Sequence, residues 1–157
     1  MSAAAIAEAA EDLMSEYAER IDASRLEEWL DLFTEDASYQ VISRENLERG
    51  LPAAIVLCIN KDMIRDRIAA LRTATKYNPH YDRHLIGRVR VAPAVGERWG
   101  VRASYAVFQT SMEGRSQLFS VGRYADTVRL EGGRLLFCEK KVVVDSFCIG
   151  GQLATPL

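Results

Sequence analysis

Long segments of alternating apolar and polar residues dominate the second half of this 157-residue chain. The stretch RWGVRASYAVFQTSM, residues 98–112, places five apolar side chains on one side of a strand: Trp99, Val101, Ala103, Tyr105 and Val107. Residues 84–95, 116–130 and 134–147 have the same texture, and Gly132-Gly133 in the last turn tolerates positive φ. A period of two is typical of half-buried strands. The pattern therefore predicts four long strands joined by short turns, in an antiparallel sheet.

The first half of the chain shows the three- and four-residue spacing of amphipathic helices. Residues 6–21 have this spacing, and Ser24 followed by Glu27 is the capping-box pattern that predicts a second helix beginning there. Asn60 is a suitable cap for a third helix over residues 61–75. These patterns predict three helices in the first half of the chain.

Two shorter strands, over residues 34–42 and 53–59, complete the order of elements. Between them we expect a polar loop that could include one helical turn. Helices grouped ahead of a run of neighbouring strands predict an α+β fold. Three helices on one side of a strongly curved antiparallel sheet would form an open cone. The chain shows no repeat, low-complexity linker or change of composition, so we expect a single domain over residues 1–157.

The composition argues against two classes of partner. The net charge is −2 with interspersed signs, whereas nucleic-acid binding needs a clustered basic face. No apolar run approaches the roughly 18 residues of a membrane-spanning helix. The N-terminal segment has no basic residue before Arg20, unlike a signal peptide, so we expect a cytoplasmic protein. Cys58, Cys138 and Cys148 lie among apolar neighbours, and we interpret them as buried free thiols in a reducing compartment.

The stretch NPHYDRHLIG, residues 78–87, holds the only two histidines, His80 and His84, with Asp82 between them. Two histidines and a carboxylate form the facial triad of some non-haem iron sites. Pro79 disfavours a helix here, and on a strand residues four apart are separated by roughly 13 Å, too far for one metal ion. No cysteine lies within twenty residues of either histidine, which argues against Rieske and zinc sites. We therefore expect hydrogen bonds and ion pairs at the start of a strand, in a core or an interface.

A cone of this kind could also hold a small hydrophobic ligand. Four polar side chains are candidates to line it: Tyr39, His84, Tyr105 and Asp145. A histidine or carboxylate in an apolar pocket can have its pKa shifted toward neutrality. One alternative function is therefore a free-standing isomerase or dehydratase that acts through a buried Asp, His or Tyr. A ligand-binding module without catalysis is another.

Arginine is concentrated in the third predicted helix and the strand after it. Six residues form this group: Arg65, Arg67, Arg72, Arg83, Arg88 and Arg90. They are either a solvated face or a subunit interface, where the planar guanidinium group is favoured because it forms paired hydrogen bonds to carboxylates.

Five stretches of the chain resemble the small (β) subunits of aromatic-ring-hydroxylating oxygenases: LEEWLDLFTEDASYQV, ENLERGLPAAIV, DMIRDRIAALRTATKYNPHYDRHLIG, LFSVGRYADTV and VVVDS. The chain is most similar to the branch that serves aromatic carboxylates such as terephthalate, salicylate and anthranilate. The resemblance implies the cone-shaped α+β fold of nuclear transport factor 2. It also implies that this chain is a non-catalytic structural subunit with no catalytic residue, cofactor or metal ligand of its own.

The resemblance further implies partners. A large (α) subunit would carry a Rieske [2Fe–2S] cluster and a mononuclear Fe(II), with electrons supplied from NAD(P)H through a reductase. The small subunit would support an α3β3 hetero-hexamer, in which β subunits also meet around the three-fold axis. We therefore expect the arginine-rich surface and the C-terminal tail to contact other subunits. The residues expected at these contacts are Arg65, Arg67, Arg72, His80, Asp82, Arg83, His84, Arg88 and Arg90.

Overall fold

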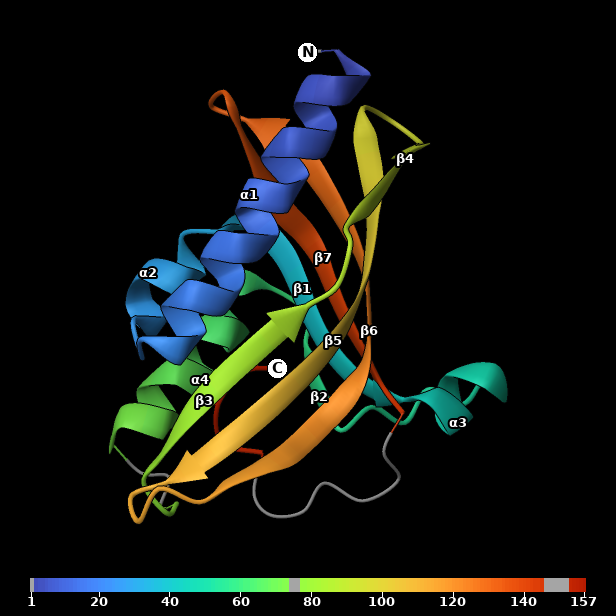
Figure 1. Ribbon diagram of the computed structural model, residues 1–157. Helices are drawn as coiled ribbons and strands as arrows, with labels where there is room; N and C mark the ends of the chain where they lie inside the picture. The colour runs from blue at the N-terminus through green and yellow to red at the C-terminus, as the bar shows by residue number, and fades with distance from the viewer. Residues whose placement is uncertain (1, 74–76, 146–152) are drawn as a thin grey trace.

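The computed structural model describes residues 2–73, 77–145 and 153–157. Its elements, labelled in Figure 1, follow in the order α1 (Ala3–Asp22), α2 (Leu26–Leu30), β1 (Phe33–Ser43), α3 (Arg44–Glu48), β2 (Val56–Cys58), α4 (Lys61–Thr73), β3 (His80–Ile86), β4 (Arg90–Ala94), β5 (Arg98–Ser111), β6 (Ser116–Glu131) and β7 (Arg134–Val144). Among the described residues, no helix is both long and apolar enough to cross a bilayer.

The strands form one curved sheet in the order β2-β1-β7-β6-β5-β3, and β4 pairs with a further stretch of β5. The predicted α+β class is confirmed. All pairs are antiparallel as predicted except β1 and β7, which run parallel. These two strands are distant in the sequence, so no short turn sets their relative direction, and the long connection between them permits a parallel pair.

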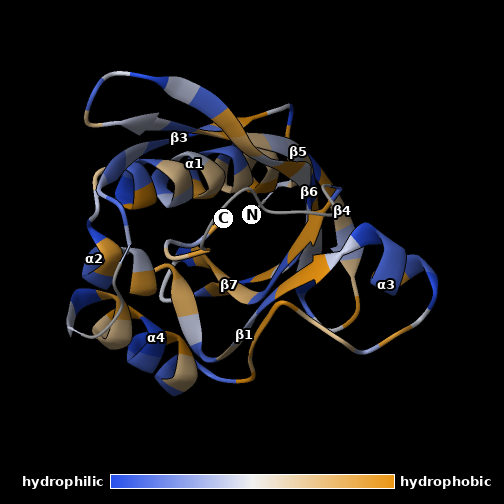
Figure 2. Cartoon of the chain, turned by 90° about the horizontal axis from the view of Figure 1, so that it is seen from below, coloured by the Kyte–Doolittle hydropathy of each residue, from blue (hydrophilic) through white to orange (hydrophobic). Residues whose placement is uncertain are grey.

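Helices α1, α2 and α4 cover one face of the sheet, and the apolar core lies between them and the strands (Figures 1 and 2). Aromatic rings from three elements meet there. The ring of Trp29 on α2 lies 4.7 Å from that of Phe33 and 5.7 Å from that of Tyr17 on α1, measured between centroids. Such tilted and edge-on pairs contribute about 0.5–1.5 kcal/mol each beyond the area that they bury.

The prediction of one domain over residues 1–157 stays a prediction.

The capping box predicted at Ser24 is wrong. Helix α2 begins one residue later than expected, and its N-cap Arg25 forms no side-chain capping bond. Ser24 instead adopts a φ of 56°, and its hydroxyl accepts a hydrogen bond from Arg72 on α4. Glu27 also binds the Arg72 guanidinium group. The charged donors of Arg72 therefore take the two side chains, Ser24 and Glu27, that would otherwise form the capping box. The cap predicted at Asn60 is confirmed, since its side chain accepts from the Met63 amide at 2.9 Å.

Other boundaries differ from the pattern of the sequence. The strand predicted over residues 84–95 is two strands, β3 and β4, because Gly87–Val89 leave the ladder between them. The one predicted over residues 53–59 is reduced to β2, and the polar loop before it contains α3, capped by the Ser43 hydroxyl. Gly122 on β6 packs so closely that an added Cβ would lie 2.0 Å from the carbonyl oxygen of Val143.

Two of the three cysteines lie in the described part of the chain. Cys58 and Cys138 are free and buried, as predicted, and burial raises the pKa of both thiols. Raised pKa values keep these sulfurs protonated and unreactive at neutral pH. Cys148 lies outside the described residues.

Candidate functional site

The C-terminal residues 153–157 lie inside the cone, between the helices and the sheet (Figure 2). Leu157 is only 1% exposed, and both polar groups of its backbone are bound by tyrosines from opposite sides of the core. The hydroxyl of Tyr17 on α1 donates to the carbonyl oxygen of Leu157 at 2.5 Å. The hydroxyl of Tyr39 on β1 accepts from its amide at 3.1 Å. The interior of the cone thus holds a segment of the chain itself.

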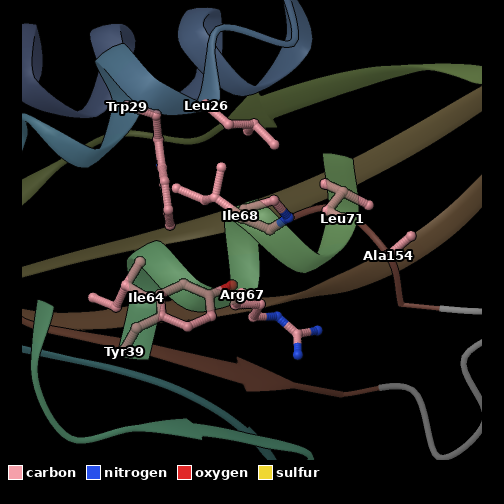
Figure 3. A pocket seen from close by; sticks show the side chains of 9 residues that line it. Leu26, Trp29, Tyr39, Ile64, Arg67, Ile68, Leu71 and Ala154 are labelled. Atoms are coloured by element: carbon pink, nitrogen blue, oxygen red, sulfur yellow. The ribbon is translucent and has the colours of Figure 1, made fainter. Parts of the chain in front are cut away.

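Two further hydrogen bonds hold this segment near the mouth of the cone. Arg67 on α4 donates to the carbonyl oxygen of Leu153 at 3.2 Å, and the Thr155 hydroxyl donates to the Asp82 carboxylate on β3 at 2.7 Å. Where the tail meets α2, α4 and β1, a cavity of about 10 Å³ remains. Such a space holds at most about one water molecule. It is lined by Leu26, Trp29, Tyr39, Ile64, Arg67, Ile68, Leu71, Ala154 and Pro156 (Figure 3).

The tyrosines of the interior stay protonated at neutral pH. Burial raises the pKa of Tyr39 to about 12 and that of Tyr17 well above its ordinary value of 10.0. Burial likewise raises the pKa of Tyr105, whose hydroxyl lies 3.0 Å from that of Ser120. These phenols therefore act as hydrogen-bonding groups rather than as bases.

A buried ion pair joins β6 and β7 beneath the tyrosines. Lys140 Nζ lies 2.8 Å from Asp126 Oδ2, and neither side chain is exposed. The same ammonium lies 3.5 Å from the ring centroid of Tyr124 and 4.1 Å from that of Tyr17. Burial lowers the pKa of Lys140 to about 8 and raises the pKa of Asp126, although each partner opposes the shift of the other. The pair lies within the core, in contact with aromatic rings.

The sequence reasoning missed this ion pair, although a signal for it exists. Asp126 lies in phase with Tyr124 and Val128 on the inward face of β6, and Lys140 lies in phase with Val142 on β7. Strict alternation along each strand directs the acid and the base into the core.

The histidines point inward along β3. His84 lies on the inward face, with its Nδ1 atom 2.6 Å from the Asp22 carboxylate at the end of α1, while its Nε2 atom is buried without a partner among the described residues. His80 Nε2 lies 3.3 Å from Asp82 and 3.1 Å from the side-chain nitrogen of Gln109. In the described part of the chain, no three His, Cys, Asp or Glu side chains come together as a metal site would require. The expected hydrogen bonds and ion pairs are present, and Asp22 is the partner that the sequence did not reveal.

Three of the four polar residues predicted to line the cone do point into it. Tyr39, His84 and Tyr105 are 2–6% exposed. The prediction for Asp145 is wrong: it follows the last residue of β7, is exposed and forms a 3.6 Å ion pair with Arg44. The alternation of β7 no longer constrains its direction because the strand ends one residue earlier.

The residues predicted for subunit contacts divide into two groups. Arg67, Arg72 and the three polar residues of β3 bond within the chain. The other four are Arg65, Arg83, Arg88 and Arg90, which are exposed, as is Arg72. Arg65 forms an ion pair with Asp62 on its own helix, and Arg83 on β3 lies 3.9 Å from the Asp22 carboxylate, whereas Arg88 and Arg90 lie beside and on β4. Their role in contacts stays a prediction.

Comparison with known proteins gives consistent matches. Residues 16–150 match the family described as "Ring hydroxylating beta subunit". The anthranilate 1,2-dioxygenase small subunit of Burkholderia cepacia is 35% identical over 92% of this chain and 90% of its own length. A terephthalate 1,2-dioxygenase terminal oxygenase β subunit of Comamonas is 33% identical over 90% of this chain and 92% of its own length.

Solved structures agree with the fold. The β subunit assigned to an aromatic-ring-hydroxylating dioxygenase of Novosphingobium aromaticivorans superposes with a TM-score of 0.89, at 39% identity over 99% of both chains. A protein of the same organism assigned as a scytalone dehydratase superposes with a TM-score of 0.70 at 17% identity, over 94% of this chain and 89% of its own, which shows the shared fold alone. The predicted cone of nuclear transport factor 2 type is therefore confirmed.

Proposed function

This chain belongs to the family of ring-hydroxylating β subunits, and from that premise we propose that it is the structural, non-catalytic subunit of a dioxygenase acting on an aromatic carboxylate. Two of its relatives are subunits of anthranilate and terephthalate dioxygenases, whose named substrates both carry carboxyl groups on an aromatic ring. These matches support the substrate class.

The observation that carries the structural role is the occupation of the cone by the chain's own tail. An enzyme of this fold would need its interior for a substrate. Here the backbone of Leu157 takes the hydrogen bonds of Tyr17 and Tyr39, and the ion pair of Lys140 and Asp126 lies within the packed core. A filled interior suits a subunit that holds others in place. The alternative of a free-standing isomerase or dehydratase has weaker support.

The iron centres of the enzyme are proposed to lie on a large subunit. Family membership supports a Rieske [2Fe–2S] cluster and a mononuclear Fe(II) there, with electrons from NAD(P)H through a reductase, and an α3β3 assembly. The described residues of this chain do not fit either centre, because they bring no three His, Cys, Asp or Glu side chains together. We place the complex in the cytoplasm.

Metal analysis of the purified chain tests the proposal. Expressed alone, the chain should contain no stoichiometric iron and show no visible absorbance, whereas the complex with its large subunit should contain both. The large subunit expressed alone under the same conditions is the control for cluster formation. Stoichiometric iron in the isolated β chain would contradict the structural role.

A further inference from the structure

We propose that the outer face of strands β3, β5 and β6 is the surface that binds the large subunit, and that an arginine cluster at one end of this face binds carboxylates of that subunit. The inference rests on the proposed function. The arginine cluster consists of Arg88, Arg90, Arg102 and Arg123.

The outer face carries an apolar strip where an antiparallel sheet usually presents polar residues. Leu85 on β3 pairs with Ala106 on β5, which pairs with Val121 on β6, so the three side chains form one row. In the next row Phe108 pairs with Leu118 on one side and with Arg83 of β3 on the other. The exposed members of the strip include Tyr81 at 60%, Leu85 at 55% and Leu118 at 54%. Contiguous exposed apolar side chains of this kind mark interaction sites.

The arginine cluster continues this face toward β4. Arg90 on β4 is the direct cross-strand partner of Arg102 on β5, and Arg123 on β6 lies opposite Ser104. Together with Arg88, in the loop between β3 and β4, these arginines help to line a hollow of about 170 Å³. No member of the cluster forms an ion pair with a described residue, and like charges directly opposite on a sheet are destabilising. The Arg44 guanidinium group lowers the pKa of Glu48, with a smaller contribution from the charge of Arg123. Glu48 forms its ion pair with Arg44, at 2.9 Å, and not with Arg123.

These features define the chemistry of the occupant. Several guanidinium groups that have no carboxylate partner among the described residues complement a segment rich in Asp or Glu, because each planar fork can form two hydrogen bonds with one carboxylate. An apolar strip beside such a cluster has the composition of a protein–protein interface, in which arginine and aromatic residues are enriched. The large subunit is the partner that membership of a small-subunit family implies.

The other surfaces of the molecule are less suited to binding a large subunit. Helices cover the inner face, and α3 lies over the outer face at β1 and β7, where Ile42 and Val143 are buried. On the α4 side, Arg72 binds Ser24 and Glu27, and Arg67 holds the tail. Outside the cluster, Arg83 on β3 lies within the apolar strip, directly opposite Phe108, and 3.9 Å from the Asp22 carboxylate. Of the arginines that the sequence suggested for subunit contacts, the arginine cluster thus keeps Arg88 and Arg90. It adds Arg102 and Arg123.

Charge reversal in the co-expressed complex tests this surface. Arg102→Glu and Arg123→Glu should each weaken the affinity for the large subunit by at least about tenfold, since each places a carboxylate against the partner's carboxylates. The matched control is Arg25→Glu, an exposed arginine at the start of α2, which should leave the affinity unchanged. Arg102→Glu should also leave the isolated chain folded, because it relieves the repulsion with Arg90.

Binding of the wild-type chain should weaken as salt is raised, and the dependence should be shallower for Arg102→Glu. Equal affinities for all variants would overturn the proposal, as would a loss confined to Arg25→Glu. A loss of self-association without a loss of large-subunit binding would show that copies of this chain, not the large subunit, occupy the face. Failure of the wild-type chain to bind any large oxygenase subunit would contradict the proposed function itself.

Discussion

The substitution Leu157→Ala tests whether the tail is part of the folded core. Its side chain is 1% exposed, and the change removes three carbon groups, worth about 2.4 kcal/mol at about 0.8 kcal/mol for each. Buried Leu→Ala changes cost about 2–5 kcal/mol once the cavity is included. We expect the free energy of unfolding to fall by about 2–4 kcal/mol. Release of the tail from the cone would limit this loss, but each hydrogen bond that holds the tail opposes its release by about 1 kcal/mol.

The assay is urea unfolding of the isolated chain, followed by circular dichroism. The midpoint should fall while the slope stays unchanged, because the surface exposed on unfolding is nearly the same. The control is Leu130→Ala on β6, whose side chain is 41% exposed and whose loss should cost less than about 0.5 kcal/mol. If Leu157→Ala costs no more than Leu130→Ala, the tail does not fill the cone, and the interior is open to a ligand rather than closed as in a structural subunit.

Two other predictions concern ionisable groups of the core. Lys140→Met should cost about 3–5 kcal/mol in urea unfolding, because it leaves the buried Asp126 carboxylate with the Lys141 amide but without a charged partner. Lys141→Met removes a half-exposed pair and should cost less than about 1 kcal/mol. Equal losses would show that the buried pair is not formed. In the second, the folded pKa of Tyr39 is raised to about 12 from an ordinary 10.0, so its contribution to stability is complete below about pH 10 and is lost as the pH rises toward 12. While the chain stays folded, phenolate absorbance of Tyr39 should therefore appear near pH 12 rather than near pH 10, judged against Tyr39→Phe. Ionisation of Tyr39 near pH 10 in a fully folded chain would contradict its burial.

Local patterns predicted most of the secondary structure. The period-two alternation of β5 predicted which of its side chains are buried, because each residue's direction follows from its neighbours. Asn60 capped its helix as expected, but Ser24 did not, since Arg72, far along the chain, competes for its hydroxyl. The parallel pair of β1 and β7 is likewise decided by contacts between distant segments, which no short pattern encodes.

The candidate site was less predictable. The five residues of the tail are too few to show a period, so nothing in the sequence placed Leu157 between Tyr17 and Tyr39. Asp22 could not be matched with His84 because the partners lie on α1 and β3, far apart in the chain. The arginine run was recognised, but only the sheet register shows that Arg102 lies opposite Arg90.

Native mass spectrometry of the co-expressed complex tests the central claim most directly. If this chain is a structural β subunit, it should co-purify with the large subunit in equal numbers, as an α3β3 assembly whose iron remains with the large subunit when the complex is dissociated. A large subunit that forms the same iron-loaded, active assembly without this chain would contradict the account.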